Sequence, residues 1–262
     1  MRIYAWLVLL NAPIVSTDDY LALIHRSASP SYSKIRNDTF RTLATDPLFR
    51  RRVSEASLIR LLNAVAWKLF DSQQESLLTR SPSPTQSQSS RTLNTSNQQG
   101  SPELQSSVPT FSRSRAMTES SEHSPGPPQP TTYVQGMNVL SAPFLYASRS
   151  ESQAYSLFYT LITRELPAYI SPTMHGVHQG LALVDKVLAI VDPKLSLYLV
   201  GKGMTAEIYG FASVLTLCAC TPPLPEVLRL WDFLFAYGVH LNILCIVAQL
   251  VILREEILRS PR

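Results

Sequence analysis

Two short stretches of the sequence carry the side chains best suited to chemistry, and the first contains an arginine. Ile35, Asp38 and Arg41 follow one another at three-residue steps, and Phe40 precedes the arginine. On a helix, Asp38 and Arg41 are neighbours at i and i+3, so the carboxylate can hold the guanidinium. Ile35 and Phe40 are expected to anchor the segment by apolar packing. The pattern is compatible with a pre-positioned arginine, but on its own it is more typical of an ordinary surface ion pair.

The second stretch contains Tyr133, Gln135, Gly136 and Asn138. Gly136 is expected to let another backbone segment come close, because glycine has no Cβ. The carboxamide of Gln135 offers one acceptor and two donors. The stretch is compatible with a functional glutamine, but on its own it is more typical of a plain polar loop.

Other catalytic and metal-binding patterns are missing from the sequence or weak. There is no glycine-rich phosphate loop and no Gly-x-Ser-x-Gly elbow. Cys218 and Cys220 are too close in sequence for the usual zinc knuckle. His175 and His178 are three positions apart but have no evident carboxylate partner. We expect the thiols to pack in the core and the histidines to be solvated or to cap a helix.

The composition is that of a globular protein without a nucleic-acid-binding surface. The chain has 262 residues, of which 45% are hydrophobic and 16% charged, with a net charge of +4. Its compact basic run, Arg50 to Arg52, is too short to track a phosphate backbone. The low cysteine usage suits a reducing compartment such as the cytoplasm.

Two apolar runs raise the question of membrane targeting. The run at residues 3–10 is too short to span a membrane, and we interpret it as a buried first helix, with a signal peptide as the alternative. Residues 241–253 have the length of a core helix. No membrane span is predicted.

Residues 72–131 differ from the rest of the chain because they are rich in Ser, Pro, Gln and Thr. Such a segment buries too little apolar area to offset its ordering entropy, so a disordered insertion within one domain is predicted. Four of its serines precede a proline, a pattern that proline-directed kinases recognise when it is exposed. These serines are Ser81, Ser83, Ser101 and Ser124.

The flanking sequence has helical periodicity throughout. Leucine and valine recur at three- and four-residue steps over 58–69, with Ser54 as the expected N-cap. The same spacing occurs over 181–191, where a proline follows, and over 227–234, which follows a proline-rich turn. Because no hairpin dipeptide separates alternating runs, an all-α fold is predicted.

Taken together, the two stretches resemble the arginine-finger and glutamine-finger motifs of the TBC domain, the catalytic domain of Rab-type GTPase activators. Two further segments agree in order and spacing: one resembles the opening helix of the domain, and the other its late Trp-Asp segment. The matching residues are Ile35, Asp38 and Arg41 for the first motif, Tyr133, Gln135, Gly136 and Asn138 for the second, Arg2 and Trp6 for the opening helix, and Leu228 to Asp232 for the late segment.

This resemblance implies a single all-α TBC domain built from residues 1–71 and 132–262 around the insertion at 72–131. It implies that Arg41 and Gln135 act in trans on GTP, with the remaining motif residues in support. The GTP and its Mg²⁺ would belong to the partner GTPase, so no cofactor of its own is implied.

Residues 208–235 are most similar to fungal mitotic-exit checkpoint members of the family. That similarity implies a small GTPase of the mitotic-exit or septation pathway as target, a scaffold subunit as partner, and residence at the spindle pole body. Two other functions are also compatible with the sequence. One is a non-catalytic module that binds a GTPase or scaffold, and the other is a Rab activator in vesicle traffic.

Overall fold

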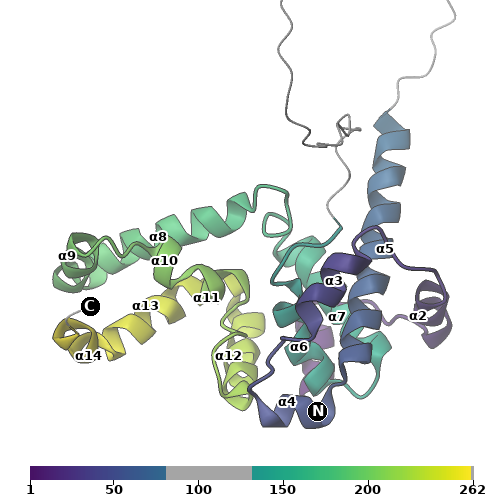
Figure 1. Ribbon diagram of the computed structural model, residues 1–262, viewed down its shortest axis with the longest axis horizontal. Coiled ribbons are helices and arrows are strands. Elements are labelled where there is room, and N and C mark those ends of the chain that lie inside the picture. The colour runs from purple at the N-terminus through teal and green to yellow at the C-terminus, as the bar shows by residue number, and fades with distance from the viewer. Residues whose placement is uncertain (81–131, 261–262) are drawn as a thin grey trace, which may run out of the picture. The chain divides into compact units, whose positions relative to one another are not determined.

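A computed structural model describes residues 1–80 and 132–260 of the chain, and within them the regular secondary structure is helical (Figure 1). The all-α prediction is therefore confirmed. The elements are α1 (Arg2–Leu9), α2 (Thr17–Ile24), α3 (Tyr32–Thr39), α4 (Pro47–Arg52), α5 (Glu55–Arg80), α6 (Met137–Ala147), α7 (Glu151–Thr160), the π-helical turn η1 (Leu161–Glu165), α8 (His175–Val191), α9 (Pro193–Gly201), α10 (Ala206–Tyr209), α11 (Phe211–Leu215), α12 (Leu224–Tyr237), the 3₁₀ turn η2 (Val239–Leu241), α13 (Asn242–Ile252) and α14 (Arg254–Arg259).

The segments before and after the predicted insertion pack into one compact unit. Residues 72–80, which the sequence assigns to the insertion, instead continue α5. The rest of the insertion, with its four Ser-Pro sites, lies outside the described residues.

An aromatic cluster joins the two ends of this unit. Trp6 of α1 and Trp231 of α12 are fully buried, with ring centroids 5.9 Å apart. Phe144 of α6 lies edge-on to Trp6 at 5.7 Å, and Phe235 lies edge-on to it at 5.2 Å. Such offset and edge-to-face pairs add to the free energy gained by burial. The apolar run at residues 3–10 is thus a packed helix, as predicted.

Asp232 connects the same two helices by polar contacts. Its carboxylate accepts hydrogen bonds from the indole Nε1 of Trp6 at 2.8 Å and from Nε of Arg2 at 3.0 Å. The indole N–H would otherwise be buried without a partner, which is costly. The opening segment and the late Trp-Asp segment therefore form one interface.

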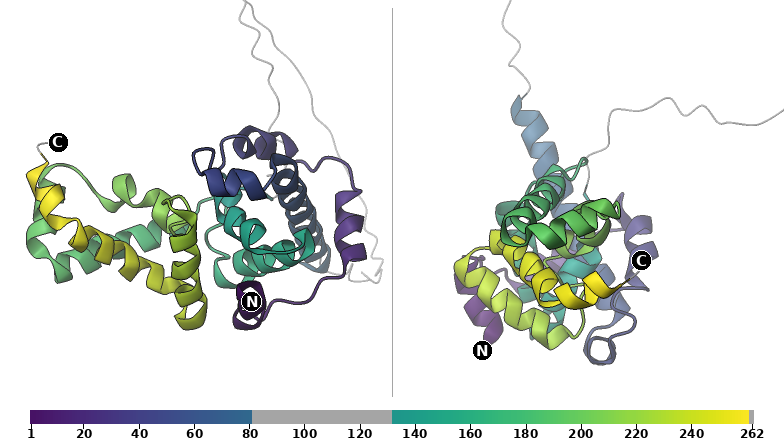
Figure 2. Two further views of the ribbon diagram at one scale, coloured as in Figure 1. Left: turned by 90° about the horizontal axis from the view of Figure 1, so that it is seen from below. Right: turned by 90° about the vertical axis from the view of Figure 1, so that its left-hand side faces the viewer.

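A second cluster occupies the C-terminal half, where α8 packs against α9 and α13, and α14 against α9 (Figure 2). Val184 and Leu188 of α8 and Ile246 and Val247 of α13 are buried there. The run at 241–253 forms a helix as expected, but one side of it faces solvent, since Ile252 is 81% exposed. Within residues 1–80 and 132–260, every helix is too short or too polar to cross a membrane.

Local signals set the helix ends as the sequence predicts. The Ser54 hydroxyl accepts a hydrogen bond from the amide of Ser57 at 3.1 Å and caps α5. Asp192 follows the last residue of α8 and caps α9 through the amide of Leu195 at 2.9 Å. These ends fix the entry and exit of the helices that carry the core.

We predict that Asp232→Ala lowers the free energy of unfolding by about 2 kcal/mol, because the buried Trp6 indole loses its acceptor. Glu226→Ala is a matched control, since Glu226 lies on the same helix and also pairs with an arginine, Arg229, at 3.0 Å. That pair is exposed, so its loss should cost less than about 0.5 kcal/mol. Urea denaturation followed by circular dichroism measures both. Equal losses for the two variants would show that the Asp232 contact carries no special stability.

Candidate functional site

Arg41 lies in a turn, not on a helix. The helix α3 ends at Thr39, and the chain then turns through residues 40–45 to reach α4. The expected i, i+3 ion pair nevertheless forms, because Nη2 of Arg41 donates to Oδ1 of Asp38. The arginine side chain remains 56% exposed. Its guanidinium is therefore held at one amino group while other donors face solvent.

The apolar anchors of this segment differ from the expectation. Ile35 is fully buried, as predicted. Phe40, which was expected to pack inward, is 66% exposed, so that prediction is wrong. The cause is the end of α3 at Thr39, because a residue in the following turn no longer shares the buried face of the helix. An exposed aromatic ring therefore stands next to Arg41.

Asp38 connects the arginine turn to the stretch around Gln135. Its carboxylate is buried, and the second oxygen accepts a hydrogen bond from the Tyr133 hydroxyl at 3.0 Å. Its backbone carbonyl accepts from Nδ2 of Asn138 at 3.3 Å and from the Thr42 hydroxyl at 3.1 Å. One residue thus binds both stretches that the sequence analysis singled out.

Asn138 completes this connection. Its Nδ2 donates to Oγ1 of Thr42 at 2.8 Å, and its Oδ1 accepts from the amide of Gly136 at 3.1 Å. The side chain therefore spans the arginine turn and the glutamine turn. Thr42 was missed by the sequence analysis, since threonine in a turn carries no signal of a partner so far along the chain.

The burial of this network changes the pKa of Tyr133. Tyr133 is almost fully buried, and its pKa is raised well above the usual value, first by burial and then by the nearby Asp38 charge. The hydroxyl therefore stays protonated and continues to donate to Asp38. The carboxylate is held by a cation on one side and a neutral donor on the other.

The backbone conformation at position 136, next to Gln135, requires a glycine. Its φ is +106°, a conformation that residues with a side chain rarely adopt. An added Cβ would also lie 2.6 Å from Cδ2 of Leu215. The glycine thus allows α11 to approach the glutamine turn, although the close neighbour is a side chain and not a backbone as expected.

Arg41 and Gln135 are both exposed and line the same pocket, which has a volume of about 490 Å³. Asp38, Gly136 and Asn138 also line it. Tyr133 and Ile35 lie behind it in the core. The apolar walls come from residues whose place in a pocket was not predicted from the sequence, because they reach it only through tertiary packing. These residues are Val134, Val139, Met174, Phe211, Ala212 and Leu215.

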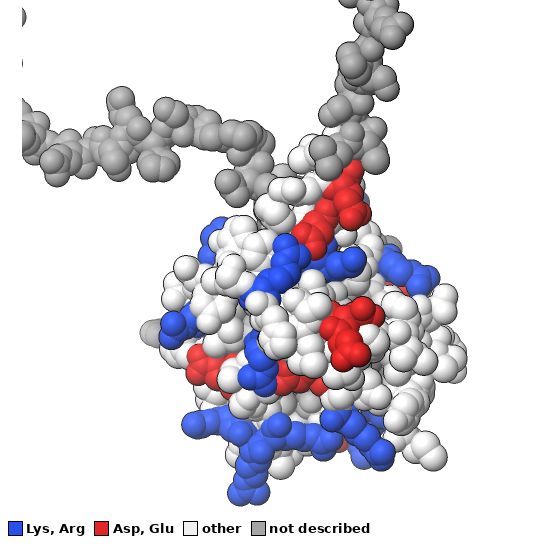
Figure 3. Space-filling view, turned by 90° about the vertical axis from the view of Figure 1, so that its right-hand side faces the viewer, with Lys and Arg blue, Asp and Glu red and all other residues white. Residues whose placement is uncertain are grey.

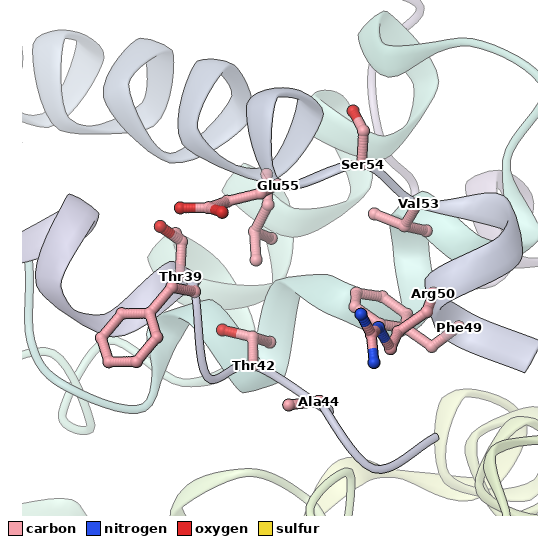
Figure 4. Close-up of a pocket in the computed structure, with 10 residues that line it drawn as sticks. Thr39, Thr42, Ala44, Phe49, Arg50, Val53, Ser54 and Glu55 are labelled. Atoms are coloured by element: carbon pink, nitrogen blue, oxygen red, sulfur yellow. The ribbon is translucent and has the colours of Figure 1, made fainter. Parts of the chain in front are cut away.

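A second hollow of about 340 Å³ adjoins the arginine turn (Figure 4). Thr39 and Thr42 from the turn region line it, as do Phe49 and Val53 from α4 and its end. None of its lining residues belongs to the first pocket. Residues of the turn thus line two hollows, and the polar contacts of Asp38 and Thr42 with Asn138 join the turn to the glutamine stretch.

The histidines and cysteines have ordinary surroundings. His175 contacts the Ser171 hydroxyl at 3.1 Å, and His178 contacts a carboxylate oxygen of Glu207 at 2.9 Å. Cys218 packs in the core as expected, where burial raises the pKa of its thiol to about 12. Cys245 is partly buried against the core. Cys220 is also only partly buried and lines the pocket of Arg41 and Gln135, so the core prediction is wrong for that thiol. Among the described residues, no group of three or more His, Cys, Asp or Glu side chains could hold a metal ion.

The chemistry available at the pocket follows from its two exposed polar groups. A guanidinium can stabilise negative charge on phosphate oxygens, and a carboxamide can both donate to an oxygen and accept from a water molecule. Neither group is a nucleophile under ordinary conditions. The arrangement suits electrostatic assistance to a reaction on a bound phosphate more than covalent catalysis.

The sequence matches a known family model, Rab-GTPase-TBC domain, over residues 128–258. Cell division control protein 16 of Schizosaccharomyces pombe is 40% identical over 260 residues, covering 99% of this chain and 67% of that protein. Mitotic check point protein BUB2 of Saccharomyces cerevisiae is 40% identical over 263 residues, covering 99% of this chain and 70% of that protein.

The fold has a counterpart among solved structures. The crystal structure of the Chlamydomonas flagellar RabGAP TBC domain superimposes with a TM-score of 0.64 at 17% identity, covering 99% of this chain and 69% of that one. That likeness concerns the fold alone, whereas the two yeast relatives and the family model concern the sequence. On these matches, the chain belongs to the Rab-GTPase-TBC domain family of GTPase activators.

Proposed function

We propose that this chain is a GTPase-activating protein that inserts Arg41 and Gln135 into the active site of a small GTPase. The observation that carries the proposal is the placement of both side chains, exposed, at one pocket. They come from distant parts of the sequence and are joined through buried Asp38 and Asn138. Membership of the family supports the same activity.

Arg41 acts on the charge that develops during hydrolysis. Negative charge spreads over the oxygens of the transferring phosphoryl group, and a guanidinium supplied by an activating protein accelerates such reactions by about 10³- to 10⁵-fold. Asp38 occupies one amino group of Arg41, which leaves its other donors for the phosphate. The GTP and Mg²⁺ are held by the partner GTPase.

Gln135 acts on the attacking water. Its carbonyl oxygen accepts a hydrogen bond from the water, while its amide group donates to the γ-phosphate. The positive φ of Gly136 sets the direction in which the glutamine turn leaves the core. Asp38, Asn138 and Tyr133 are positioning residues, because they contact the turns and not the nucleotide.

The target in this proposal is a small GTPase of the mitotic-exit or septation pathway. Two yeast proteins named for cell division control and for the mitotic check point are 40% identical to nearly all of this chain, which supports that choice. A scaffold subunit completes the activator, and the complex acts in the cytoplasm at the spindle pole body. A Rab protein of vesicle traffic is the alternative target.

We predict that Arg41→Ala lowers stimulated GTP hydrolysis by about a thousandfold or more while leaving complex formation largely intact. Gln135→Ala should lower the same rate by about a hundredfold. Single-turnover hydrolysis at saturating activator measures both, using candidate GTPases of the two pathways with and without the scaffold subunit.

Arg36→Ala is the matched control for Arg41, since it removes an exposed arginine of α3 that does not line the pocket. It should retain most of the stimulated rate. An unchanged rate in Arg41→Ala would exclude the arginine-finger role. Stimulation of only vesicle-traffic GTPases would retain that role and overturn the proposed pathway.

We predict that Asp38→Asn reduces the maximal stimulated rate by about tenfold to a hundredfold, because Arg41 loses its charged anchor and the finger is misplaced. The GTPase concentration at half-maximal rate should change much less. Thermal unfolding of the variant, compared with Tyr133→Phe, separates lost positioning from lost folding. A variant that unfolds normally and stimulates like wild type would show that Asp38 has no positioning role.

We predict that Phe40→Ala raises the GTPase concentration at half-maximal rate by about tenfold and leaves the maximal rate nearly unchanged. An exposed aromatic ring beside the catalytic arginine is suited to anchor a partner surface. Tyr237→Ala is the control, because that ring is 70% exposed but lies on α12 outside the pocket. Equal effects of the two substitutions would contradict an anchoring role for Phe40.

A further inference from the structure

The arginine run at the end of α4 is not used by the proposed reaction, and the structure adds a fourth arginine to it. Arg50, Arg51 and Arg52 are all exposed. Arg149 lies in the connection between α6 and α7. It lines two surface hollows, and Arg52 lines both of them as well. Figure 3 shows Lys and Arg side chains gathered along the lower edge of one face, the edge at which Figure 1 places α4.

The two hollows adjoin each other at Arg52 and Arg149, which line both of them. The larger has a volume of about 380 Å³ and is also lined by Ser148 and Ser150. The smaller has a volume of about 160 Å³ and is also lined by Tyr146. We call this feature the arginine groove. It shares no residue with the pocket of Arg41 and Gln135.

The positive charge of the groove is not neutralised within the described part of the chain. Neither Arg52 nor Arg149 has a carboxylate within salt-bridge distance there. Arg52 instead lies over the ring of Tyr146, with its guanidinium carbon 5.2 Å from the ring centre. Such stacking restrains the guanidinium without using its hydrogen-bond donors.

The carboxylate that borders the groove is already paired. Glu151 lines the larger hollow, but it accepts from Nη2 of Arg60 at 2.5 Å and from the Tyr20 hydroxyl at 3.0 Å. Burial raises the pKa of Glu151, but its hydrogen bonds, that from Arg60 first, lower it below the usual value. Its charge is therefore offset by Arg60. Arg2 also lines the smaller hollow and pairs with Asp232 at 3.0 Å, so Arg52 and Arg149 are the groove arginines whose charge remains in excess.

A buried polar group at the groove also lacks a partner. Ser148 is only 8% exposed, and its hydroxyl makes no hydrogen bond within the described part of the chain. A buried hydroxyl without a partner is costly, so a ligand that supplies one gains free energy. Ser148 lines the hollow in which an acceptor oxygen would sit between the arginines.

We propose that the arginine groove binds an extended, phosphorylated acidic segment of a partner protein. The lining cations are arginines, whose planar guanidinium groups bind phosphate oxygens in pairs. Two adjoining hollows with shared arginines match successive acidic groups of an extended chain. A flat membrane surface would instead meet the protruding side chains and leave such hollows unfilled.

The test uses the full chain and a fluorescein-labelled pool of degenerate acidic peptides, each containing phosphoserine, with fluorescence anisotropy as readout. Arg52→Gln and Arg149→Gln should each weaken binding about tenfold, since each removes a charge-assisted hydrogen-bonding group. Arg51→Gln is the matched control, because it makes the same charge change on the same helix but lines neither hollow. It should change the affinity less than about twofold.

Several outcomes would overturn the proposal. These are equal binding of the same pool with serine in place of phosphoserine, equal loss in Arg51→Gln and Arg52→Gln, or no binding by wild type. Binding to vesicles of phosphatidylcholine and phosphatidylserine without binding to the phosphopeptides would identify a membrane-facing surface instead. The comparison of phosphoserine with serine needs only the wild-type chain, so it decides the case even where a variant folds poorly.

The groove is independent of the proposed GTPase activation. Arg41→Ala should therefore bind the phosphopeptide pool with wild-type affinity, and Arg149→Gln should keep the wild-type rate of stimulated hydrolysis at saturating GTPase. Loss of peptide binding in Arg41→Ala would show that the peptides bind at the catalytic pocket and would overturn the assignment to the groove.

Discussion

The pocket depends on the carboxylate of Asp38, a buried charge with partners on both sides. A buried carboxylate is tolerated only when cations and donors satisfy it, and here Arg41 and Tyr133 do so. The pair has two effects. Arg41 stabilises the buried carboxylate of Asp38, and Asp38 in turn holds the guanidinium of Arg41 in place. Polar satisfaction, more than hydrophobic burial, therefore sets the geometry of the exposed guanidinium.

The features of the fold that could be predicted are those set by residues close together in the sequence. The cap at Ser54 and the end of α8 before Pro193 depend on residues within one turn, so the sequence contains them in full. The contact of Trp6 with Asp232 could be anticipated only through the resemblance to a family, since 226 positions separate the two residues. Where α5 ends was missed, because its apolar periodicity fades before its backbone helix does.

The site was predictable in its polar residues and not in its surroundings. The spacing of Asp38 and Arg41 gives the ion pair whether the second residue lies on a helix or in the turn after it. The orientation of Phe40 is different, because it depends on where α3 stops. Met174 and Phe211 enter the pocket through the packing of the C-terminal half, and no periodicity in their own segments points to the glutamine turn.

The ion pair with Asp38 explains why an arginine suits this position better than a lysine. Pairing with a carboxylate removes most of the net charge, so what remains for a phosphate is a set of directed donors. The guanidinium has five N–H donors in one plane, and one amino group can face Asp38 while the others face outward. An ammonium concentrates its charge at one nitrogen, which the buried carboxylate would hold within the pocket wall. For the proposed role of Arg41, the anchor is compatible with catalysis only because the cation is extended and planar.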